Sequence, residues 1–321
     1  MTGDQPAALI VAGPTASGKS ALALALAERF AGTVINADSM QVYRELRVLT
    51  ARPTAEEEAR VPHRLYGVRP AAEAASVAWW RDAALAAMAD ARAAGRLPIL
   101  CGGTGMYLAA LTEGLSDIPP VPAAAREEAR RMLAEDGPAA LHARLAAADP
   151  ETAARLRPGD SQRVARAYEV WRGTGRGLAA WQAGGGGRPA PWRFSAVLLD
   201  PPRDALRAAI AARWDAMLGA GALEEVRALA ALGLDPALPA MRAHGVPELV
   251  AVLAGRMALA EASRRAILHT GQYTKRQATW FRHHALANPS RTHTIHARIA
   301  GLAQLSASFL AECFAFVDRL R

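Results

Sequence analysis

The chain has 321 residues, of which 51% are hydrophobic and 21% are charged, so global intrinsic disorder is excluded. No apolar run approaches the roughly 18 residues of a membrane-spanning helix, and the only two cysteines, Cys101 and Cys313, exclude a disulfide framework or a cysteine-built metal site. The formal charge of +8 is concentrated between Arg242 and Arg298, where nine basic residues accompany two acidic ones, a pattern typical of a polyanionic partner or of a solvated helical face.

Short apolar runs alternate with helical patterns in the first part of the chain, which predicts a parallel sheet flanked by helices. We expect strands at residues 8–12, 33–36 and 97–101. Helices are expected from Ser20 to about Phe30 and from a Ser76 cap to about Ala94.

The middle of the chain has a different character. After the proline-rich break at residues 117–122, residues 123–183 show almost only helical periodicity. A glycine linker then leads to strand character at residues 194–199. We therefore expect an α/β core formed by residues 1–115 and 191–321, with additional C-terminal helices, and a helical insertion domain at residues 116–190.

A phosphate-binding motif follows the first predicted strand. Residues 13–20 match G-x-x-x-x-G-K-[ST] and open a predicted helix, the context that a P-loop requires. Such a loop points backbone N–H groups at an anion, and the helix N-terminus adds a favourable dipole. The core is therefore predicted to be P-loop NTPase-like, with a kinase or triphosphatase as the default function. The predicted phosphate-binding residues are Gly13, Pro14, Thr15, Ala16, Ser17, Gly18, Lys19 and Ser20.

Lys19 and Ser20 carry the chemistry of this motif. Only two of the 38 basic residues are lysines, so a lysine retained in this loop indicates a need for a compact, mobile cation. Ser20 is the predicted ligand of Mg²⁺, the expected cofactor.

Asp38 follows the second predicted strand. A right-handed crossover brings the end of that strand next to the P-loop, so we expect the Asp38 carboxylate in the same crevice. Coordination of Mg²⁺ and capping of a helix through Asp38 or Ser39 are the alternative roles. Thr104, which follows the third strand between glycines, is a candidate hydrogen-bond donor to the same anion.

Seven sequence blocks occur in the order found in tRNA dimethylallyltransferases of the bacterial type, and from about residue 8 to residue 285 the chain resembles that family. The blocks are Gly13–Ser20, Asn36–Tyr43, Thr50–Pro53, Pro62–Arg64, Gly102–Tyr107, Asp160–Arg163 and Lys275–Arg282. The resemblance implies transfer of a dimethylallyl group from dimethylallyl diphosphate to N6 of the adenosine immediately 3′ of the anticodon. It also implies that the P-loop holds diphosphate in place of ATP and that the insertion grips the anticodon stem-loop.

The resemblance assigns the role of general base to Asp38 and a contact with the diphosphate to Arg213. Thr104, the candidate hydrogen-bond donor to the same anion, is the third predicted catalytic residue. Predicted tRNA contacts are Asp38, Ser39, Met40, Gln41, Thr104, Arg126, Gln162, Arg163, Val164, Ala165, Arg166, Arg242, Ala243, His244, Gly245, Val246, Pro247, Lys275, Arg276, Gln277, Ala278, Thr279, Trp280, Phe281 and Arg282.

Within the last block, Trp280 and Phe281 lie among basic residues, an arrangement that favours base stacking with phosphate binding, although helical aromatics are also typical core residues. The chain departs from the family at Val246, where an aromatic residue is usual. A small-molecule kinase, an adenylate isopentenyltransferase and a non-catalytic RNA-binding module remain as alternatives. We expect a monomer of the reducing cytoplasm, with tRNA and dimethylallyl diphosphate as partners and no contact with membranes.

Overall fold

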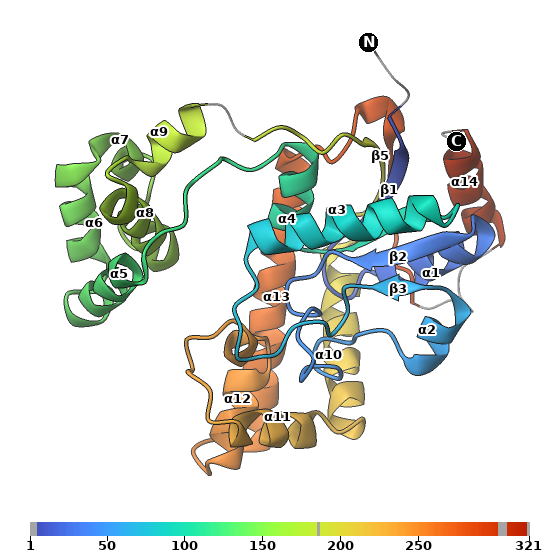
Figure 1. The fold of residues 1–321 in the computed structure, drawn as a ribbon. Helices are drawn as coiled ribbons and strands as arrows, with labels where there is room; N and C mark the ends of the chain where they lie inside the picture. Colours follow the sequence, from blue (N-terminus) through green and yellow to red (C-terminus); the bar gives the residue numbers. More distant parts are fainter. Residues whose placement is uncertain (1–4, 185–186, 301–306, 320–321) are drawn as a thin grey trace. The chain divides into compact units, whose positions relative to one another are not determined.

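The structure is a computed structural model that describes residues 5–184, 187–300 and 307–319 (Figure 1). The chain divides into two compact units. The core unit comprises Met1–Thr112 and Ala190–Arg321, and the insertion unit comprises Glu113–Pro189.

The described part of the core unit contains a six-stranded parallel sheet in the order β3-β2-β4-β1-β5-β6. The strands are β1 (Ala7–Ala12), β2 (Gly32–Asn36), β3 (His63–Arg64), β4 (Leu97–Gly102), β5 (Arg193–Leu199) and β6 (Thr292–Ile295). The predicted α/β class with a parallel, P-loop NTPase-like core is confirmed, as are the four strands expected from apolar runs. The two edge strands were not predicted, because β3 has two residues and β6 is mostly polar.

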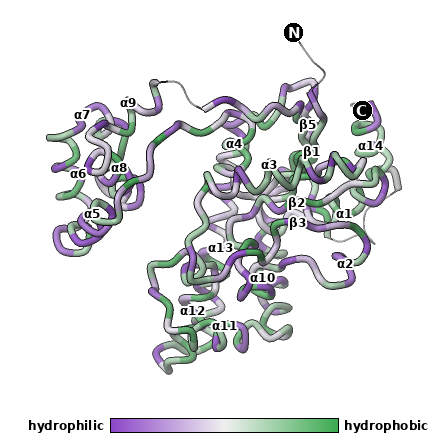
Figure 2. The backbone as a smooth tube through the Cα atoms, in the orientation of Figure 1, coloured by the Kyte–Doolittle hydropathy of each residue, from purple (hydrophilic) through white to green (hydrophobic). Residues whose placement is uncertain are grey.

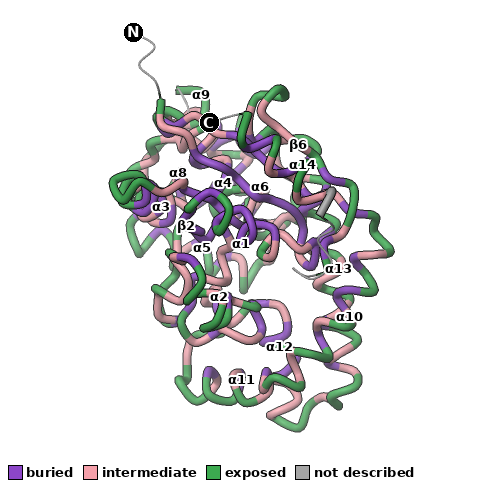
Figure 3. Tube along the Cα trace, turned by 90° about the vertical axis from the view of Figure 1, so that its right-hand side faces the viewer, coloured by how far each residue is buried: buried purple, intermediate pink, exposed green. Residues whose placement is uncertain are grey.

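Helices cover both faces of the sheet. Alternate residues of β1 point to opposite faces, so Leu9 and Val11 pack under α1 and α14, while Ile10 and Ala12 belong to the cluster beneath the other helices. β1 is apolar throughout (Figure 2), and β2 is buried along its whole length (Figure 3). The helices of this unit are α1 (Lys19–Arg29), α2 (Ala55–Arg60), α3 (Val77–Ala93), α4 (Gly105–Thr112), α10 (Arg203–Gly219), α11 (Ala222–Ala231), α12 (Val246–Leu253), α13 (Leu259–His283) and α14 (Ala307–Asp318), with short 3₁₀ turns at Ala240–Arg242 and Pro289–Arg291.

The predicted start of α3 shows how local sequence sets an element. The Ser76 hydroxyl accepts a hydrogen bond from the Trp79 amide, which satisfies one of the free N–H groups of the first turn. Gly95 follows the helix with a φ of 68°, a conformation that glycine adopts at low cost.

The insertion unit is helical and has its own core. Its buried cluster includes Ala129, Leu141, Leu145 and Val164, and the four-residue spacing of Leu141 and Leu145 places both on one face of their helix. Its helices are α5 (Ala123–Glu135), α6 (Gly137–Ala148), α7 (Pro150–Ala154), α8 (Ser161–Thr174) and α9 (Leu178–Ala183).

Candidate active site

The phosphate-binding motif forms the turn between β1 and α1 in the core unit. Gly18, the N-cap of α1, has a φ of 96°. A Cβ atom at this position would lie 2.1 Å from the carbonyl oxygen of Ile299, so both the backbone angle and the close neighbour require glycine. The motif therefore has the strand–loop–helix context that the sequence predicts.

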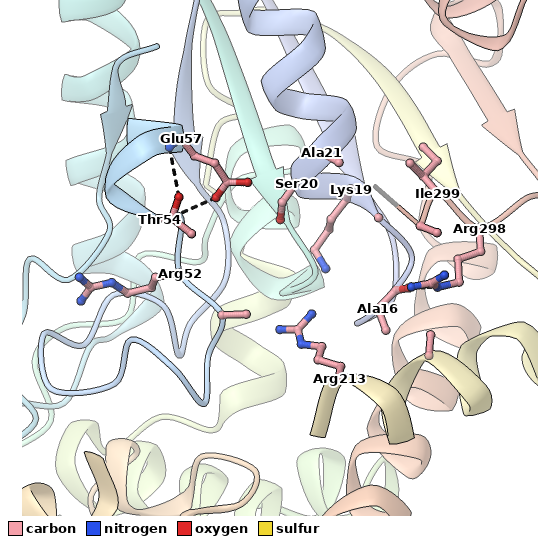
Figure 4. Close-up of a pocket in the computed structure, with 14 residues that line it drawn as sticks. Ala16, Lys19, Ser20, Ala21, Arg52, Thr54, Glu57, Arg213, Arg298 and Ile299 are labelled. Atoms are coloured by element: carbon pink, nitrogen blue, oxygen red, sulfur yellow. Dashed lines mark hydrogen bonds between the residues drawn. The ribbon is translucent and has the colours of Figure 1, made fainter. Parts of the chain in front are cut away.

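A cavity of about 330 Å³ opens beside this loop (Figure 4). Four basic residues line it, and Glu57 is the one acidic residue in its lining. The Glu57 carboxylate accepts a hydrogen bond of 2.9 Å from the Thr54 amide within the capping box of α2. The basic lining residues are Lys19, Arg52, Arg213 and Arg298. The excess of positive charge suits the cavity to a polyvalent anion.

Lys19 and Arg213 extend into this space from α1 and α10 (Figure 4). Burial lowers the pKa of the Lys19 ammonium, and the nearby Asp38 carboxylate opposes that change. The pKa of the Arg213 guanidinium is lowered by burial and raised by Asp38 in the same way. Both residues are partly buried, so an anion bound between them would be less screened by water than at the open surface.

Asp38 lies just after β2, where side chains and backbone fix the turn. Asn36 Oδ1 accepts a 2.8 Å hydrogen bond from the Asp38 amide, and Asn36 Nδ2 donates one of 2.9 Å to the Asp38 carbonyl. Asp38 Oδ1 accepts from the Met40 amide at 2.9 Å, within a turn. The next helix, α2, begins at Ala55, so the alternative role of Asp38 or Ser39 as a helix cap is not realised.

Thr104 connects the ends of β2 and β4. Its hydroxyl oxygen accepts a 2.9 Å hydrogen bond from the Ser39 amide, and its own amide donates to the Ala37 carbonyl at 3.2 Å. A Cβ on Gly102 would lie 2.1 Å from Ala37 backbone atoms, so the two strand ends approach this closely only because position 102 is glycine. Of the three predicted catalytic residues, Arg213 lines the pocket. Asp38 and Thr104 lie outside its lining, at the ends of β2 and β4, and the Asp38 carboxylate acts electrostatically on Lys19 and Arg213.

Tyr273 of α13 is a neighbour that sequence reasoning missed. Burial and the Asp38 carboxylate raise the pKa of its phenol to about 12, while its hydrogen bond with Thr104 acts in the opposite direction. The Tyr273 ring also lies 5.0 Å from that of His244. No local pattern distinguishes this tyrosine, because its position in the site depends on how α13 packs against the strand ends.

Gln277 does not have the exposed position that a tRNA contact requires. Its side chain is 4% exposed. Gln277 Oε1 accepts from the Thr15 amide at 2.8 Å, and Gln277 Nε2 donates to the Gly103 carbonyl at 2.9 Å. This glutamine ties the phosphate loop to the turn after β4, so its place in the predicted list is corrected to a positioning role.

We predict that Gln277→Leu destabilises the core unit and distorts the phosphate loop. The substitution leaves the partly buried N–H of Thr15 and the buried C=O of Gly103 without these partners. An unsatisfied buried group costs about 1–3 kcal/mol. Urea denaturation measures the loss. Gln272→Leu, on an exposed part of the same helix, is the matched control and should have little effect. Equal unfolding free energies for the two variants would contradict the bridging role.

The stacking surface predicted at the end of α13 is also corrected. Phe281 is 6% exposed and belongs to the core. One face of the Trp280 ring packs on Gly105, where a Cβ would approach to 2.4 Å, and His284 stacks on the ring at 4.2 Å with an interplanar angle of 4°. The apolar ring faces are thus used for packing, because this end of α13 lies against α4.

The other predicted tRNA contacts differ in exposure. Four further residues are buried, so their side chains are not available to RNA: Val164, Ala243, Val246 and Ala278. Ten are exposed: Arg126, Gln162, Arg163 and Arg166 in the insertion unit, and Arg242, Pro247, Lys275, Arg276, Thr279 and Arg282 in the core unit. Gly245 is buried as well. The remaining predicted contacts are partly exposed: Ser39, Met40, Gln41, Thr104, Ala165 and His244.

Comparisons with known proteins agree on one family. The family model described as IPP transferase matches residues 41–284. A tRNA dimethylallyltransferase of Granulibacter bethesdensis is 62% identical over 311 residues, covering 97% of both chains. One from Acidiphilium cryptum is also 62% identical and covers 97% of this chain and 94% of its own length.

Solved structures give the same result for the fold. The tRNA isopentenylpyrophosphate transferase of Bacillus halodurans superposes with a TM-score of 0.68 at 31% identity, over 98% of each chain. A eukaryotic dimethylallyltransferase crystallised in action on tRNA gives a TM-score of 0.81 at 24% identity, over 98% of this chain and 79% of that one. None of the helices in the described ranges has the length and apolar character needed to cross a membrane.

Proposed function

Because the chain belongs to the IPP transferase family, we propose that it is a tRNA dimethylallyltransferase. It transfers the dimethylallyl group of dimethylallyl diphosphate to N6 of the adenosine that follows the anticodon, releasing diphosphate. One observation carries this assignment beyond family membership. The cationic pocket of Lys19 and Arg213 lies within electrostatic reach of the Asp38 carboxylate, so a site for a diphosphate leaving group stands beside a candidate base.

The proposed reaction is a substitution at the allylic carbon. The exocyclic amine of adenine is a weak nucleophile, and Asp38 takes a proton from nitrogen as the N–C bond forms. The C–O bond to diphosphate breaks, and its electron pair stays on the departing oxygen. Lys19, Arg213 and the amides of the phosphate loop stabilise that charge, while Thr104 donates to the same anion. The proton on Asp38 then passes to water.

Mg²⁺ is the proposed cofactor, and the residues present fit it. The Ser20 hydroxyl lines the pocket at the start of α1, where a P-loop supplies its metal ligand. Phosphate oxygens and water would complete the coordination, as is usual for Mg²⁺ beside phosphates. When bound, the ion would neutralise part of the diphosphate charge. This arrangement leaves Asp38 free to act as the base.

We propose that tRNA contacts the exposed basic residues through the anticodon stem-loop. In such a loop the target base is already outside a regular duplex, which lowers the cost of extruding it. We also propose that the protein is a monomer that acts in the cytoplasm.

We predict that Arg282→Ala weakens tRNA binding and makes its salt dependence shallower. Arg282 is exposed and 3.7 Å from Asp200, so it can exchange this partner for a phosphate. Loss of one phosphate contact reduces the slope of log K against log salt by about 0.7–0.9. Filter binding of tRNA across a series of salt concentrations measures this slope. Arg227→Ala removes an arginine from a similar surface pair, 3.6 Å from Glu224, and serves as the control. An unchanged slope for Arg282→Ala would place this residue off the RNA.

Incubation of the protein with Mg²⁺, unmodified tRNA and radiolabelled dimethylallyl diphosphate tests the proposed function. Label should enter tRNA and be found on the adenosine next to the anticodon. Label entering free AMP instead would identify an adenylate isopentenyltransferase. Phosphate transfer from ATP without uptake of label would identify a kinase.

A further inference from the structure

The segment that follows β6 lies across the phosphate loop. The Ile299 amide donates a 2.9 Å hydrogen bond to the Ser17 carbonyl, and Arg298 Nε donates one of 3.0 Å to the Ala16 carbonyl. Ile299 is also the residue that a Cβ on Gly18 would strike. Two carbonyls of the loop are thus satisfied from a segment about 280 residues away in sequence.

Arg298 also has a feature that its hydrogen bond to the Ala16 carbonyl does not require. Arg298 lines the same pocket as Lys19 and Arg213. Figure 4 shows the Lys19 ammonium and the guanidinium groups of Arg213 and Arg298, which belong to three different segments of the chain. Only Nε is used in the contact with Ala16. Within residues 5–184, 187–300 and 307–319, no acidic partner lies within ion-pair distance of Arg298.

We propose that Arg298 is a diphosphate-binding residue. Nε holds the Ala16 carbonyl, and the two Nη groups bind phosphate oxygens of the diphosphate through charge-assisted hydrogen bonds. The planar guanidinium has the fork geometry needed to serve both partners at once, which an ammonium lacks. The segment after β6 therefore forms the side of the site that holds Arg298. This inference rests on the proposed function, which places diphosphate in that pocket.

Two variants distinguish a contact of Arg298 with diphosphate from its hydrogen bond to the phosphate loop. Arg298→Ala removes both interactions. Arg298→Gln keeps an N–H donor for the Ala16 carbonyl but removes the charge, so it should behave like Ala if the charge contacts diphosphate. Arg264→Ala removes an exposed arginine from α13 outside the pocket and controls for the change in net charge.

Calorimetric titration of the full chain with inorganic pyrophosphate and Mg²⁺ tests the proposal. We expect Arg298→Ala and Arg298→Gln each to raise the Kd by about tenfold or more, the effect of losing a charged hydrogen bond. Arg264→Ala should leave the Kd unchanged. In the transfer assay, the KM for dimethylallyl diphosphate should rise while the KM for tRNA stays constant.

The outcomes that oppose the proposal are distinct. Retention of tight binding by Arg298→Gln, or by both variants, would overturn the contact with diphosphate and leave Arg298 as a brace of the loop. Absence of pyrophosphate binding by the unsubstituted chain would overturn the proposed function itself, and this inference with it.

Discussion

Asp38→Asn is expected to abolish prenyl transfer while leaving tRNA binding intact. Asparagine has the same shape, and its Oδ1 can keep the 2.9 Å hydrogen bond from the Met40 amide that fixes the turn. An amide cannot take up the proton of the adenine amine, however. Loss of a general base lowers the rate by about 10²–10⁴-fold.

Single-turnover transfer with labelled donor and saturating tRNA measures this loss, and filter binding measures the affinity for tRNA. Asp82→Asn is the matched control, because it removes the same charge from an exposed position on α3. If Asp38→Asn were as active as the control, the carboxylate would not be the base. If it lost tRNA binding as well, the residue would act in positioning the RNA.

Replacement of Lys19 is expected to have the second large effect. Lys19→Ala removes a cation that lines the pocket, and alanine has no group that could replace its interaction with diphosphate. Removing one preorganised group that stabilises a developing anion costs about 10²–10³-fold in kcat. Lys19→Arg should not restore activity, because the pocket already holds the planar guanidinium groups of Arg213 and Arg298.

Steady-state kinetics and pyrophosphate titration measure the effect of both variants. Lys275→Arg makes the same change at the other lysine of the chain, on the exposed surface of α13, and should bind pyrophosphate normally. Full activity of Lys19→Arg would show that position 19 needs only a positive charge, against the requirement for a compact cation.

The features predicted correctly from the sequence are those that short segments determine. β1 is a run of apolar residues followed by a complete phosphate-binding motif, and the Ser76 cap precedes α3 by one residue. The handedness of strand–helix–strand crossovers predicted that the chain after β2, with Asp38, lies at the same end of the sheet as the phosphate loop. In the sheet β4 lies between β2 and β1. Each inference needed only local pattern and general topology.

The features that were missed depend on contacts between distant segments. Thr15 and Gln277 are 262 positions apart, and Arg298 and Ala16 are 282 apart. The residues around Gln277 in the sequence do not indicate that it binds the phosphate loop. Those around Arg298 do not indicate its contact with Ala16 either. Phe281 was misplaced for the same reason, because a basic and aromatic stretch does not reveal which side of its helix faces the core.

A crystal structure of the protein with tRNA and a non-reactive thiolodiphosphate analogue of the donor is the most direct test of the account. The diphosphate should lie in the phosphate loop, within hydrogen-bond distance of Lys19 and Arg213, and the adenine amine should face Asp38. An analogue bound elsewhere, with the loop free or taken by ATP, would contradict the account.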